Sequence, residues 1–252
     1  MINATESAEN STIRRGELIS RRAGRPRVLP QMVGGQRSWI APREEILDVA
    51  AGLFVERGFA ATSTRDIAEA VGIRQASIYY HFPSGKEEIL GDLLQRSIRP
   101  TLDRIEKIEF LGAETGAAPG VLLYVLVVLD VRTLARAPRN AGVLARLPEV
   151  QRKEVFGPFG AARDELKAAY ARLGTQVAAT HPNAAMTPDS NLLGTLLLQL
   201  VEVVIGMRSD GHRINQTIEA TVAASCLRVC LADQARIDDV ATRAVDLIGA
   251  LE

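Results

Sequence analysis

The stretch TRDIAEAVGIRQASIYYHFPSGKEEIL, from Thr64 to Leu90, contains a segment of about seven residues, Gln75 to His81, between a glycine-containing turn and a proline. A helix that short is marginal on its own. The chain has only 4 Tyr, 6 Phe and 1 Trp, yet three of these aromatic residues fall between Tyr79 and Phe82. This concentration indicates that the short segment needs aromatic side chains for packing, for function or for both.

Helical periodicity surrounds this segment. Apolar residues recur at spacings of three and four, as on one face of a helix. The predicted helices are Pro42–Arg57, Thr64–Val71, Gln75–His81, Lys86 to about Glu109, Val121–Ala137, Ala141–Leu147, Glu149 to about Gln176, Pro188–Met207, Ile214–Ala232 and Arg236–Ala250. No strand-like alternation with hairpin turns occurs in the sequence, so it predicts an all-α protein of about ten helices.

On a helical wheel, the segment Gln75–Phe82 has two different faces. Ile78 and Phe82, four residues apart, share one face and are expected to pack on a core made by the two preceding helices. Ala76 and Tyr80 point away from that core, where a solvent-facing helix would usually carry Lys and Glu. The alternative is that the tyrosine rings simply pack against the following helix.

The outward face suits a nucleic-acid groove. Gln can pair with adenine, Ala can touch a thymine methyl group, and Ser or Tyr hydroxyls can donate to phosphate. The N-terminus of the preceding helix, at Thr64 and Arg65, is a natural phosphate site, and Lys86 begins the next helix. Two helices joined by a glycine turn form a helix-turn-helix, whose second helix enters the major groove of DNA.

This stretch, preceded by ILDVAAGLFVERGFAATS, closely resembles the DNA-binding domain of TetR-family transcriptional regulators over about residues 42–95. The shared elements are an Ala-rich first helix ending in RGF, a T-x-x-x-IA-x-x-x-G second helix and a Y-x-HF-x-S-x-K-E exit. The resemblance implies a homodimer with an N-terminal three-helix DNA-binding domain and a helical C-terminal domain. It also implies a repressor released from a palindromic operator by a small-molecule effector. A ligand-independent DNA-binding protein and an activator are the alternatives.

Positions carried over from the family give the candidate DNA contacts. Thr64 and Lys86 match phosphate contacts. The positions that match base or backbone contacts are Arg65, Gln75, Ala76, Ser77, Tyr79, Tyr80 and His81. Arg74, just before the short helix, is an additional candidate. Gly85 makes the exit one residue longer than in the family pattern, which can change the direction of Lys86.

The formal net charge is zero, but positive charge gathers near the N-terminus. Residues 1–40 hold seven Arg and three Glu, a net of +4, and few apolar residues, so we expect a disordered basic arm. Arg25 and Arg27, in RRAGRPR, can lie in a narrow A·T-rich minor groove; a solvated tail is the alternative. Residues 41–88 then form the DNA-binding domain, and residues 89–252 the effector-binding and dimerisation domain.

Deleting residues 1–36 tests the arm. The slope of log K against log salt for DNA binding should become shallower by about 0.9 for each phosphate contact that is lost. An unchanged slope, measured on the deleted and the full chain, would show that the arm is a solvated tail.

The helix predicted at Pro188–Met207 is apolar on most sides, and a belt this wide implies burial on two sides. We expect it and the helix Ile214–Ala232 to form a four-helix bundle with their copies in a second chain, and the resemblance points the same way. The expected interface residues are Leu193, Leu196, Leu197, Leu200, Val204, Ile218, Val222 and Cys226. A core made within one chain is the alternative.

An effector pocket is expected between the helices Val121–Ala137 and Pro188–Met207. It would be mostly apolar with a few polar groups, as ligand sites usually are. The candidate polar residues are Tyr124, Asp130, Asn191, Thr195, Gln199 and Glu202. The alternative for each is a solvent-facing position or a structural ion pair.

Other function classes find little support in the sequence. The N-terminus has no apolar segment of a secretory signal, and the longest apolar run, Val121–Leu129, is less than half a membrane span. The only cysteines, Cys226 and Cys230, are expected to be small buried hydrophobes, which fits a reducing cytoplasm; a redox or metal pair is the alternative. Without metal-ligand spacing, a phosphate-cradling glycine loop or GxSxG, we predict a cytoplasmic DNA-binding protein with no catalytic site, metal, cofactor or membrane partner.

Overall fold

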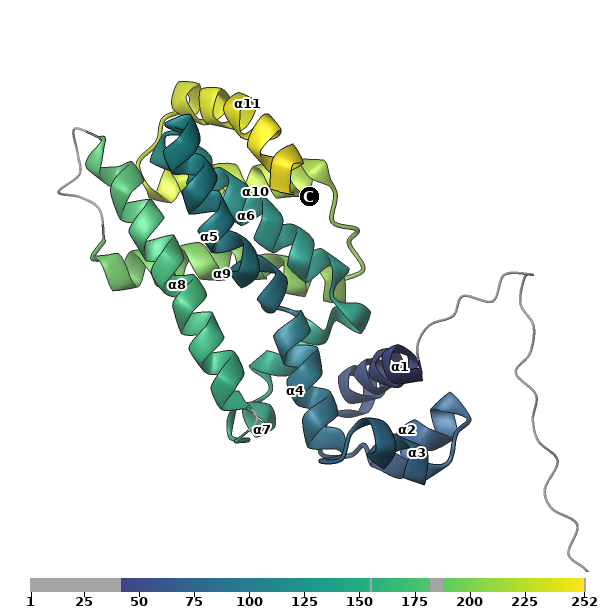
Figure 1. Cartoon of the computed structure of the whole chain (residues 1–252). Coiled ribbons are helices and arrows are strands. Elements are labelled where there is room, and N and C mark those ends of the chain that lie inside the picture. Colours follow the sequence, from purple (N-terminus) through teal and green to yellow (C-terminus); the bar gives the residue numbers. More distant parts are fainter. Residues whose placement is uncertain (1–41, 155, 182–187, 252) are drawn as a thin grey trace, which may run out of the picture. The chain divides into compact units, whose positions relative to one another are not determined.

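The structure is a computed structural model that describes residues 42–154, 156–181 and 188–251 (Figure 1). Within these ranges it contains helices and no strand, so the predicted all-α class is confirmed. The predicted basic arm, with Arg25 and Arg27, lies outside the described residues. The elements are α1 Pro42–Arg57, α2 Thr64–Val71, α3 Gln75–His81, α4 Lys86–Arg96, α5 Arg99–Thr115, α6 Pro119–Arg136, the 3₁₀ helix η1 Pro138–Arg146, α7 Pro148–Gln151, α8 Phe156–Ala179, α9 Ser190–Ser209, α10 Gln216–Val229 and α11 Gln234–Leu251.

Helices α1 to α3 pack around one apolar core, in which Phe54, Phe59, Ile67, Ile78 and Phe82 are at most 1% exposed. The local sequence explains how α2 and α3 meet. A capping box at the start of α2 pairs the Ser63 and Asp66 side chains with each other's backbone N–H. Gly72 ends α2 at φ 82°, in the left-handed region that favours glycine. The helix-turn-helix expected from the sequence therefore forms.

The prediction of one continuous helix from Lys86 to about Glu109 is wrong. The chain instead forms α4 and α5, which are separated at Ser97 and Ile98. Pro100 has no N–H and cannot donate to the carbonyl of Arg96, so a continuous helix would lose a hydrogen bond there. The helix also continues through residues 111–115, predicted as loop, and ends at Gly116, where φ is 63°.

A second predicted helix, from Glu149 to about Gln176, is also interrupted. The chain forms a single turn, α7, and then the long helix α8. The short helix predicted at Ala141–Leu147 is a longer 3₁₀ segment, η1, in which Arg139 and Asn140 adopt left-handed φ values of 45° and 56°. Asn140 Nδ2 offsets this strain by donating to Ile205 O of α9 at 2.8 Å.

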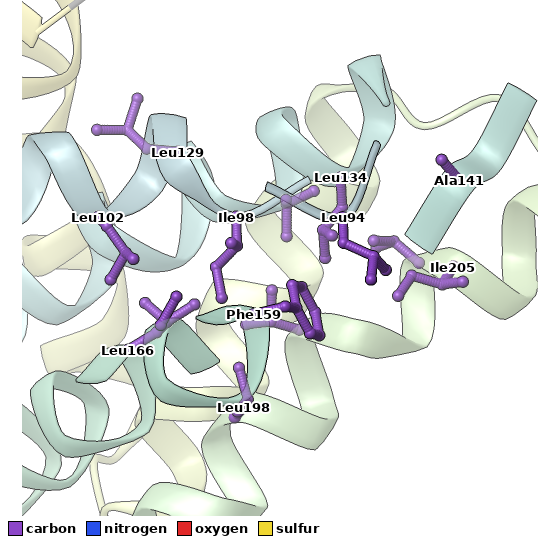
Figure 2. Close-up of a cluster of buried hydrophobic side chains, with 14 of the residues drawn as sticks. Leu94, Ile98, Leu102, Leu129, Leu134, Ala141, Phe159, Leu166, Leu198 and Ile205 are labelled. Carbon is purple, nitrogen blue, oxygen red and sulfur yellow. The ribbon is translucent and has the colours of Figure 1, made fainter. Parts of the chain in front are cut away.

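Helix α6 is central to the remaining helices, because it contacts α5, α8, α9, α10 and α11 (Figure 1). The apolar core continues from Leu94 and Ile98, at the α4–α5 junction, to Phe159 of α8 and Ile205 of α9 (Figure 2). Helices α8 and α9 approach closely at Gly194, where a Cβ atom would lie 2.7 Å from the carbonyl oxygen of Lys167. Only glycine fits this contact without displacing the backbone.

The described residues, 42–154, 156–181 and 188–251, belong to one unit by their contacts. The 3₁₀ segment η1 contacts both α1 and α9, so it links the first three helices to the later ones. The division between residues 88 and 89 stays a prediction.

Candidate nucleic-acid interface

The two faces expected for α3 are present. Ile78 and Phe82 are 0% exposed, whereas Tyr79 is 47% and Tyr80 is 82% exposed. The other side chains predicted to face a partner are exposed or half-buried: Gln75, Ala76, Ser77 and His81. Packing therefore uses one face of α3 and leaves the opposite face open to a partner.

Three polar side chains join the start of α2 to α3. Gln75 Nε2 donates to Thr64 Oγ1 at 2.9 Å, and the Tyr79 hydroxyl lies 3.3 Å from the same atom. Thr64 is only 9% exposed, and its hydroxyl is engaged by α3, so the predicted phosphate contact of Thr64 stays a prediction. Its backbone N–H, at the first position of α2, remains a candidate phosphate donor. The Gln75 carboxamide oxygen and the exposed part of the Tyr79 ring remain available on the outward face.

The Lys86 side chain contacts the loop between α1 and α2. Its ammonium donates to the carbonyl oxygens of Phe59 at 2.9 Å and Thr62 at 2.8 Å, and lies 4.5 Å from the centre of the Phe59 ring. Lys86 therefore points into the α1–α2 loop and fixes the start of α2. A direct phosphate contact by Lys86 stays a prediction, and it would require the ammonium to give up one of these carbonyls.

The extra residue Gly85 has a conformational role. It precedes α4 at φ 69° and ψ −138°, a backbone conformation that residues with a Cβ atom rarely adopt. A Cβ atom there would lie 3.4 Å from the Tyr79 ring and 3.5 Å from the Thr64 methyl group. A cleft of about 330 Å³ opens beside these residues, between the start of α2 and the start of α4.

Arg65 and Arg74 lie at the exposed ends of the two helices. The Arg65 side chain is 76% exposed and pairs with Glu69 at 3.2 Å, one turn along α2. Such exposed pairs contribute little to stability, so Arg65 can exchange Glu69 for a phosphate at low cost. Arg74 is exposed at the position that precedes α3, where its side chain makes no capping bond. Both positions are compatible with the predicted DNA contacts, which stay predictions.

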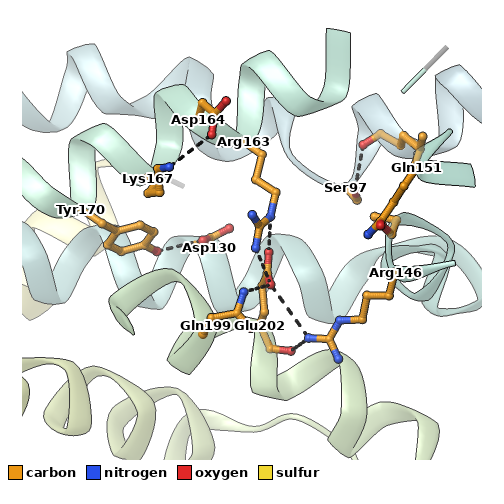
Figure 3. Close-up of polar contacts among 12 residues, drawn as sticks. Ser97, Asp130, Arg146, Gln151, Arg163, Asp164, Lys167, Tyr170, Gln199 and Glu202 are labelled. Carbon is orange, nitrogen blue, oxygen red and sulfur yellow. Dashed lines mark hydrogen bonds and ion pairs between the residues drawn. The ribbon is translucent and has the colours of Figure 1, made fainter. Parts of the chain in front are cut away.

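The six predicted effector residues do not gather around one cavity. Gln199 and Glu202 line a cavity of about 410 Å³ with Arg146 and Arg163, between η1, α8 and α9 (Figure 3). Tyr124 lines a separate groove beside α10 and α11. The remaining predicted residues lie elsewhere: Asp130, Asn191 and Thr195. The sequence pattern missed the two arginines, because their helices were not assigned to the pocket.

The polar side of the 410 Å³ cavity is built around Glu202. Arg163 donates from Nε and Nη2 to the two Glu202 carboxylate oxygens, at 2.8 and 3.0 Å. Gln199 Nε2 donates to the same carboxylate at 3.0 Å, and Arg146 Nη2 donates to the Glu202 backbone oxygen at 2.9 Å. Phe156 and Phe159 contribute apolar surface, so the cavity combines two guanidinium groups with aromatic rings.

Asp130 is a buried core residue, 2% exposed, and not part of this cavity. Its carboxylate accepts from the Tyr170 hydroxyl at 2.8 Å (Figure 3). It also accepts from Thr101 Oγ1 at 3.0 Å. Burial raises the pKa of Asp130 from 3.8 to about 6, while the two hydroxyl donors oppose this rise and Glu202 adds to it. The prediction that Asp130 contacts an effector is wrong for this structure, because surrounding helices enclose its side chain.

Asp130→Asn should change how stability depends on pH. Because the pKa of Asp130 is higher in the folded than in the unfolded state, the free energy of unfolding of the wild type falls as pH rises from about 4 through about 6. A shift of this size corresponds to a total loss of about 3 kcal/mol in the free energy of unfolding. The free energy of unfolding of the variant, relative to wild type, should therefore rise by up to that amount between about pH 4 and about pH 7. Urea unfolding across this range checks it, and a difference that does not change with pH would contradict the assignment.

Four residues of the predicted dimer interface are instead fully buried within one chain: Leu193, Leu197, Val204 and Cys226. Val222 is also buried, at 7% exposure. Because α9 is apolar on most sides, its periodicity alone could not show which stripe faces α8. The stripe left at the surface contains Leu192 at 48%, Leu196 at 39% and Val203 at 46% exposure.

This exposed stripe continues into an apolar groove between α9 and α10. The groove, of about 240 Å³, includes Leu200 and Ile218 from the predicted interface, together with Val203 and Met207. Leu196, Leu200 and Ile218 therefore keep their predicted place at the surface. Leu192 and Val203 are the residues that the sequence reasoning missed.

The two cysteines are buried free thiols. Burial raises the pKa of Cys230 to about 12 and raises the pKa of Cys226 further, so neither thiol forms a reactive thiolate near neutral pH. Among the described residues, no group of three or more His, Cys, Asp or Glu side chains could hold a metal ion.

Comparison with known proteins gives structural matches to most of the chain and sequence matches to its N-terminal part. Residues 46–93 match the family model described as bacterial regulatory proteins, tetR family. The crystal structure of AmtR from Mycobacterium smegmatis is 35% identical and has a TM-score of 0.71, and the likeness covers 85% of this chain and 96% of AmtR. The structure of the ketosteroid transcriptional regulator KstR2 of Mycobacterium tuberculosis has a TM-score of 0.58 at 21% identity, covering 79% of this chain and 97% of that one. The latter likeness concerns the fold alone.

The HTH-type transcriptional repressor KstR2 of Rhodococcus jostii (strain RHA1) is 41% identical over 75 residues, which are 30% of this chain and 36% of that repressor. The chain therefore matches little more than a third of the length of this curated relative.

Proposed function

Because the chain belongs to the TetR family of transcriptional regulators, we propose that it is a repressor that binds operator DNA through α2 and α3 and is released by a small molecule. The observation that carries DNA binding is the open face of α3, where Tyr80 is 82% exposed beside Ala76 and Gln75. Hydrogen-bonding aromatic and small side chains on such a face suit a DNA groove better than bulk water. The match to a named repressor supports repression rather than activation.

The start of α2 is the proposed phosphate site. The capping box satisfies the Asp66 N–H, which leaves the N–H groups of Thr64 and Arg65 at the positive end of the helix for an anion. The exposed Arg65 guanidinium adds a charge-assisted donor. Lys86 stabilises this site indirectly, because its ammonium donates hydrogen bonds to the carbonyl oxygens of the loop that precedes α2.

A second copy of the chain is the proposed partner of α9 and α10. By length and composition α9 is apolar enough to cross a membrane, but one side of it packs on α8 and α10 within the chain. We assign its other side, with Leu192, Leu196 and Val203, to a homodimer in the cytoplasm. A dimer also presents two α3 helices to the two half-sites of a near-palindrome about 34 Å apart.

The cavity around Glu202 is the proposed effector site, because two of the elements that line it, η1 and α7, also contact α1 and the loop that leads into α2. Arg146 belongs to η1, in which Arg139 pairs with Asp48 of α1 at 3.2 Å. Just beyond η1, Glu149 of α7 accepts a hydrogen bond from the Ala60 N–H at 3.2 Å, next to the start of α2. A ligand that moves η1 or α7 would therefore act on α1 and α2 through these contacts. No enzymatic activity, metal or cofactor is part of this proposal.

Tyr80→Phe should weaken operator binding without changing the fold. The hydroxyl is exposed, and losing one hydrogen bond to phosphate costs about 1–2 kcal/mol, or roughly a five- to thirtyfold loss of affinity. Fluorescence anisotropy with operator DNA measures the loss. Tyr124→Phe, which removes a tyrosine hydroxyl far along the chain, should leave affinity unchanged. Equal affinities of wild type and Tyr80→Phe would exclude the proposed contact.

A further inference from the structure

Three hydrogen-bonding side chains connect α2 to α3 on the surface proposed to face DNA. Gln75 Nε2 donates to Thr64 Oγ1 at 2.9 Å, and the Tyr79 hydroxyl lies 3.3 Å from the same oxygen. Thr64 is buried, whereas Gln75 and Tyr79 are exposed. We call these three residues the α2–α3 relay. Both of its ends are open to a partner, while its middle is enclosed.

The hydrogen bonds of the relay run in one direction in the structure. A threonine hydroxyl has one hydrogen to donate and two lone pairs with which to accept. Because the Thr64 oxygen accepts from Gln75, its own hydrogen is left for the Tyr79 hydroxyl, its one other hydrogen-bond partner among the described residues. The Tyr79 hydrogen is then left for a partner outside the relay. The relay therefore presents a donor at Tyr79 and the carboxamide oxygen of Gln75 as an acceptor.

The reverse direction is chemically allowed in the free protein, because hydroxyls can exchange roles and an amide can turn by about 180° about its last bond. The Gln75 amino group would then face outward, and Tyr79 would donate to Thr64. A DNA phosphate distinguishes the two directions, because its oxygens accept hydrogen bonds from the protein. A phosphate beside Tyr79 requires Tyr79 as the donor, so it selects the direction in which the carboxamide oxygen faces outward.

The structure has room for such a phosphate. The cleft of about 330 Å³ between the start of α2 and the start of α4 is lined by Tyr79, Ser84 and Lys86. Its one acidic lining residue, Glu87, pairs with Lys153 at 3.6 Å. The cleft therefore brings hydroxyl and ammonium donors to the Tyr79 end of the relay.

We propose that the relay couples a phosphate contact to base recognition. Tyr79 donates to a DNA phosphate, and Thr64 thereby holds the Gln75 carboxamide oxygen toward the bases. An outward acceptor pairs with the major-groove amino group of adenine or cytosine, whereas guanine and thymine present acceptors there. Thr64 is a positioning residue, because its hydroxyl acts through Gln75. This inference rests on the proposed binding of operator DNA through α2 and α3.

Base substitutions in a selected operator test the proposal. Fluorescence anisotropy compares duplexes that carry each of the four bases at every half-site position, with the full chain and its variants. The position that Gln75 reads is the one whose base preference disappears in Gln75→Ala. There the wild type should bind adenine or cytosine at least about fivefold more tightly than guanine or thymine, as expected for one base contact.

Thr64→Val removes the hydroxyl and keeps the shape of the side chain. The amide of Gln75 can then present either end, so the base preference at its position should fall to about twofold or less. Thr64→Ser, which keeps a hydroxyl, should retain the preference. If Thr64 only contacted a phosphate, Thr64→Val would weaken binding to all duplexes equally and leave the base preference unchanged.

The other end of the relay provides a second variant. Tyr79→Phe should also reduce the base preference, because Thr64 can then donate to the carboxamide oxygen and hold the amide in the reverse orientation. Tyr80→Phe is the matched control, since it removes an α3 hydroxyl that takes no part in the relay. It should weaken binding to all duplexes and keep the base preference. A cooperative thermal melt shows that each variant is folded.

The proposal is overturned if guanine or thymine is preferred at the Gln75 position, or if Gln75→Ala changes no base preference. It is also overturned if folded Thr64→Val or Tyr79→Phe keeps the wild-type preference. These outcomes leave specific operator binding intact and so reject the relay alone. Equal binding of the wild type to selected and scrambled duplexes would instead reject the proposed function, and the relay with it.

Discussion

Phe82→Ala should lower the free energy of unfolding by about 3–5 kcal/mol. The Phe82 side chain is 0% exposed and lies at the end of a seven-residue helix that is too short to be stable alone. The Arg43 guanidinium also stacks over the Phe82 ring, 4.6 Å from the ring centre. Removing the ring leaves a cavity in the core of α1 to α3 and takes away the anchor of α3. Urea unfolding followed by circular dichroism measures the loss.

Tyr80→Ala is the matched control, because it removes an aromatic ring two residues earlier on the open face. A substitution at an exposed site of this kind usually changes stability by less than about 0.5 kcal/mol. If Phe82→Ala and Tyr80→Ala cost the same, the division of α3 into a packing face and a recognition face is wrong.

Leu196→Glu combined with Val203→Glu should disrupt the proposed dimer and leave a monomer. Both side chains lie on the exposed apolar stripe of α9, where two charges per chain would be buried without partners in the proposed interface. Operator affinity should then fall by about 10²–10⁴-fold, because one half-site alone loses the avidity of two. Light scattering and fluorescence anisotropy on the same samples measure both effects.

Val245→Glu provides the control for this experiment. Val245 is an apolar residue of α11 that is 64% exposed, but it lies outside the proposed interface. This variant should stay dimeric and bind operator as wild type. A dimer that persists in the α9 double variant would show that the interface lies elsewhere.

The sequence predicts α3 and its two faces well for a physical reason. Ile78 and Phe82 are four residues apart on a short segment bounded by a glycine turn and a proline, so only one rotation of the helix buries both. The buried and exposed positions of Phe82 and Tyr80 in the structure agree with that rotation. The family resemblance over the same region is confirmed by the match of residues 46–93.

Other features could not be read in the same way. On α9 both sides are apolar, so periodicity fits two interfaces, and Leu193 and Leu197 belong to the one inside the chain. The role of Lys86 depends on the carbonyls of a loop more than twenty residues away in sequence. The break before α5, in contrast, was encoded locally by Pro100 and could have been predicted from it.

The central claim is that the open face of α3 reads a specific operator. Selection of bound duplexes from a random pool by the full chain, followed by anisotropy at one fixed salt concentration, tests it most directly. The selected sequence should be near-palindromic, with half-sites about one helical turn apart or a multiple of it, and should bind at least about 10³-fold more tightly than a scrambled duplex. Equal affinity for the selected and the scrambled duplex would show that α3 does not read a specific operator.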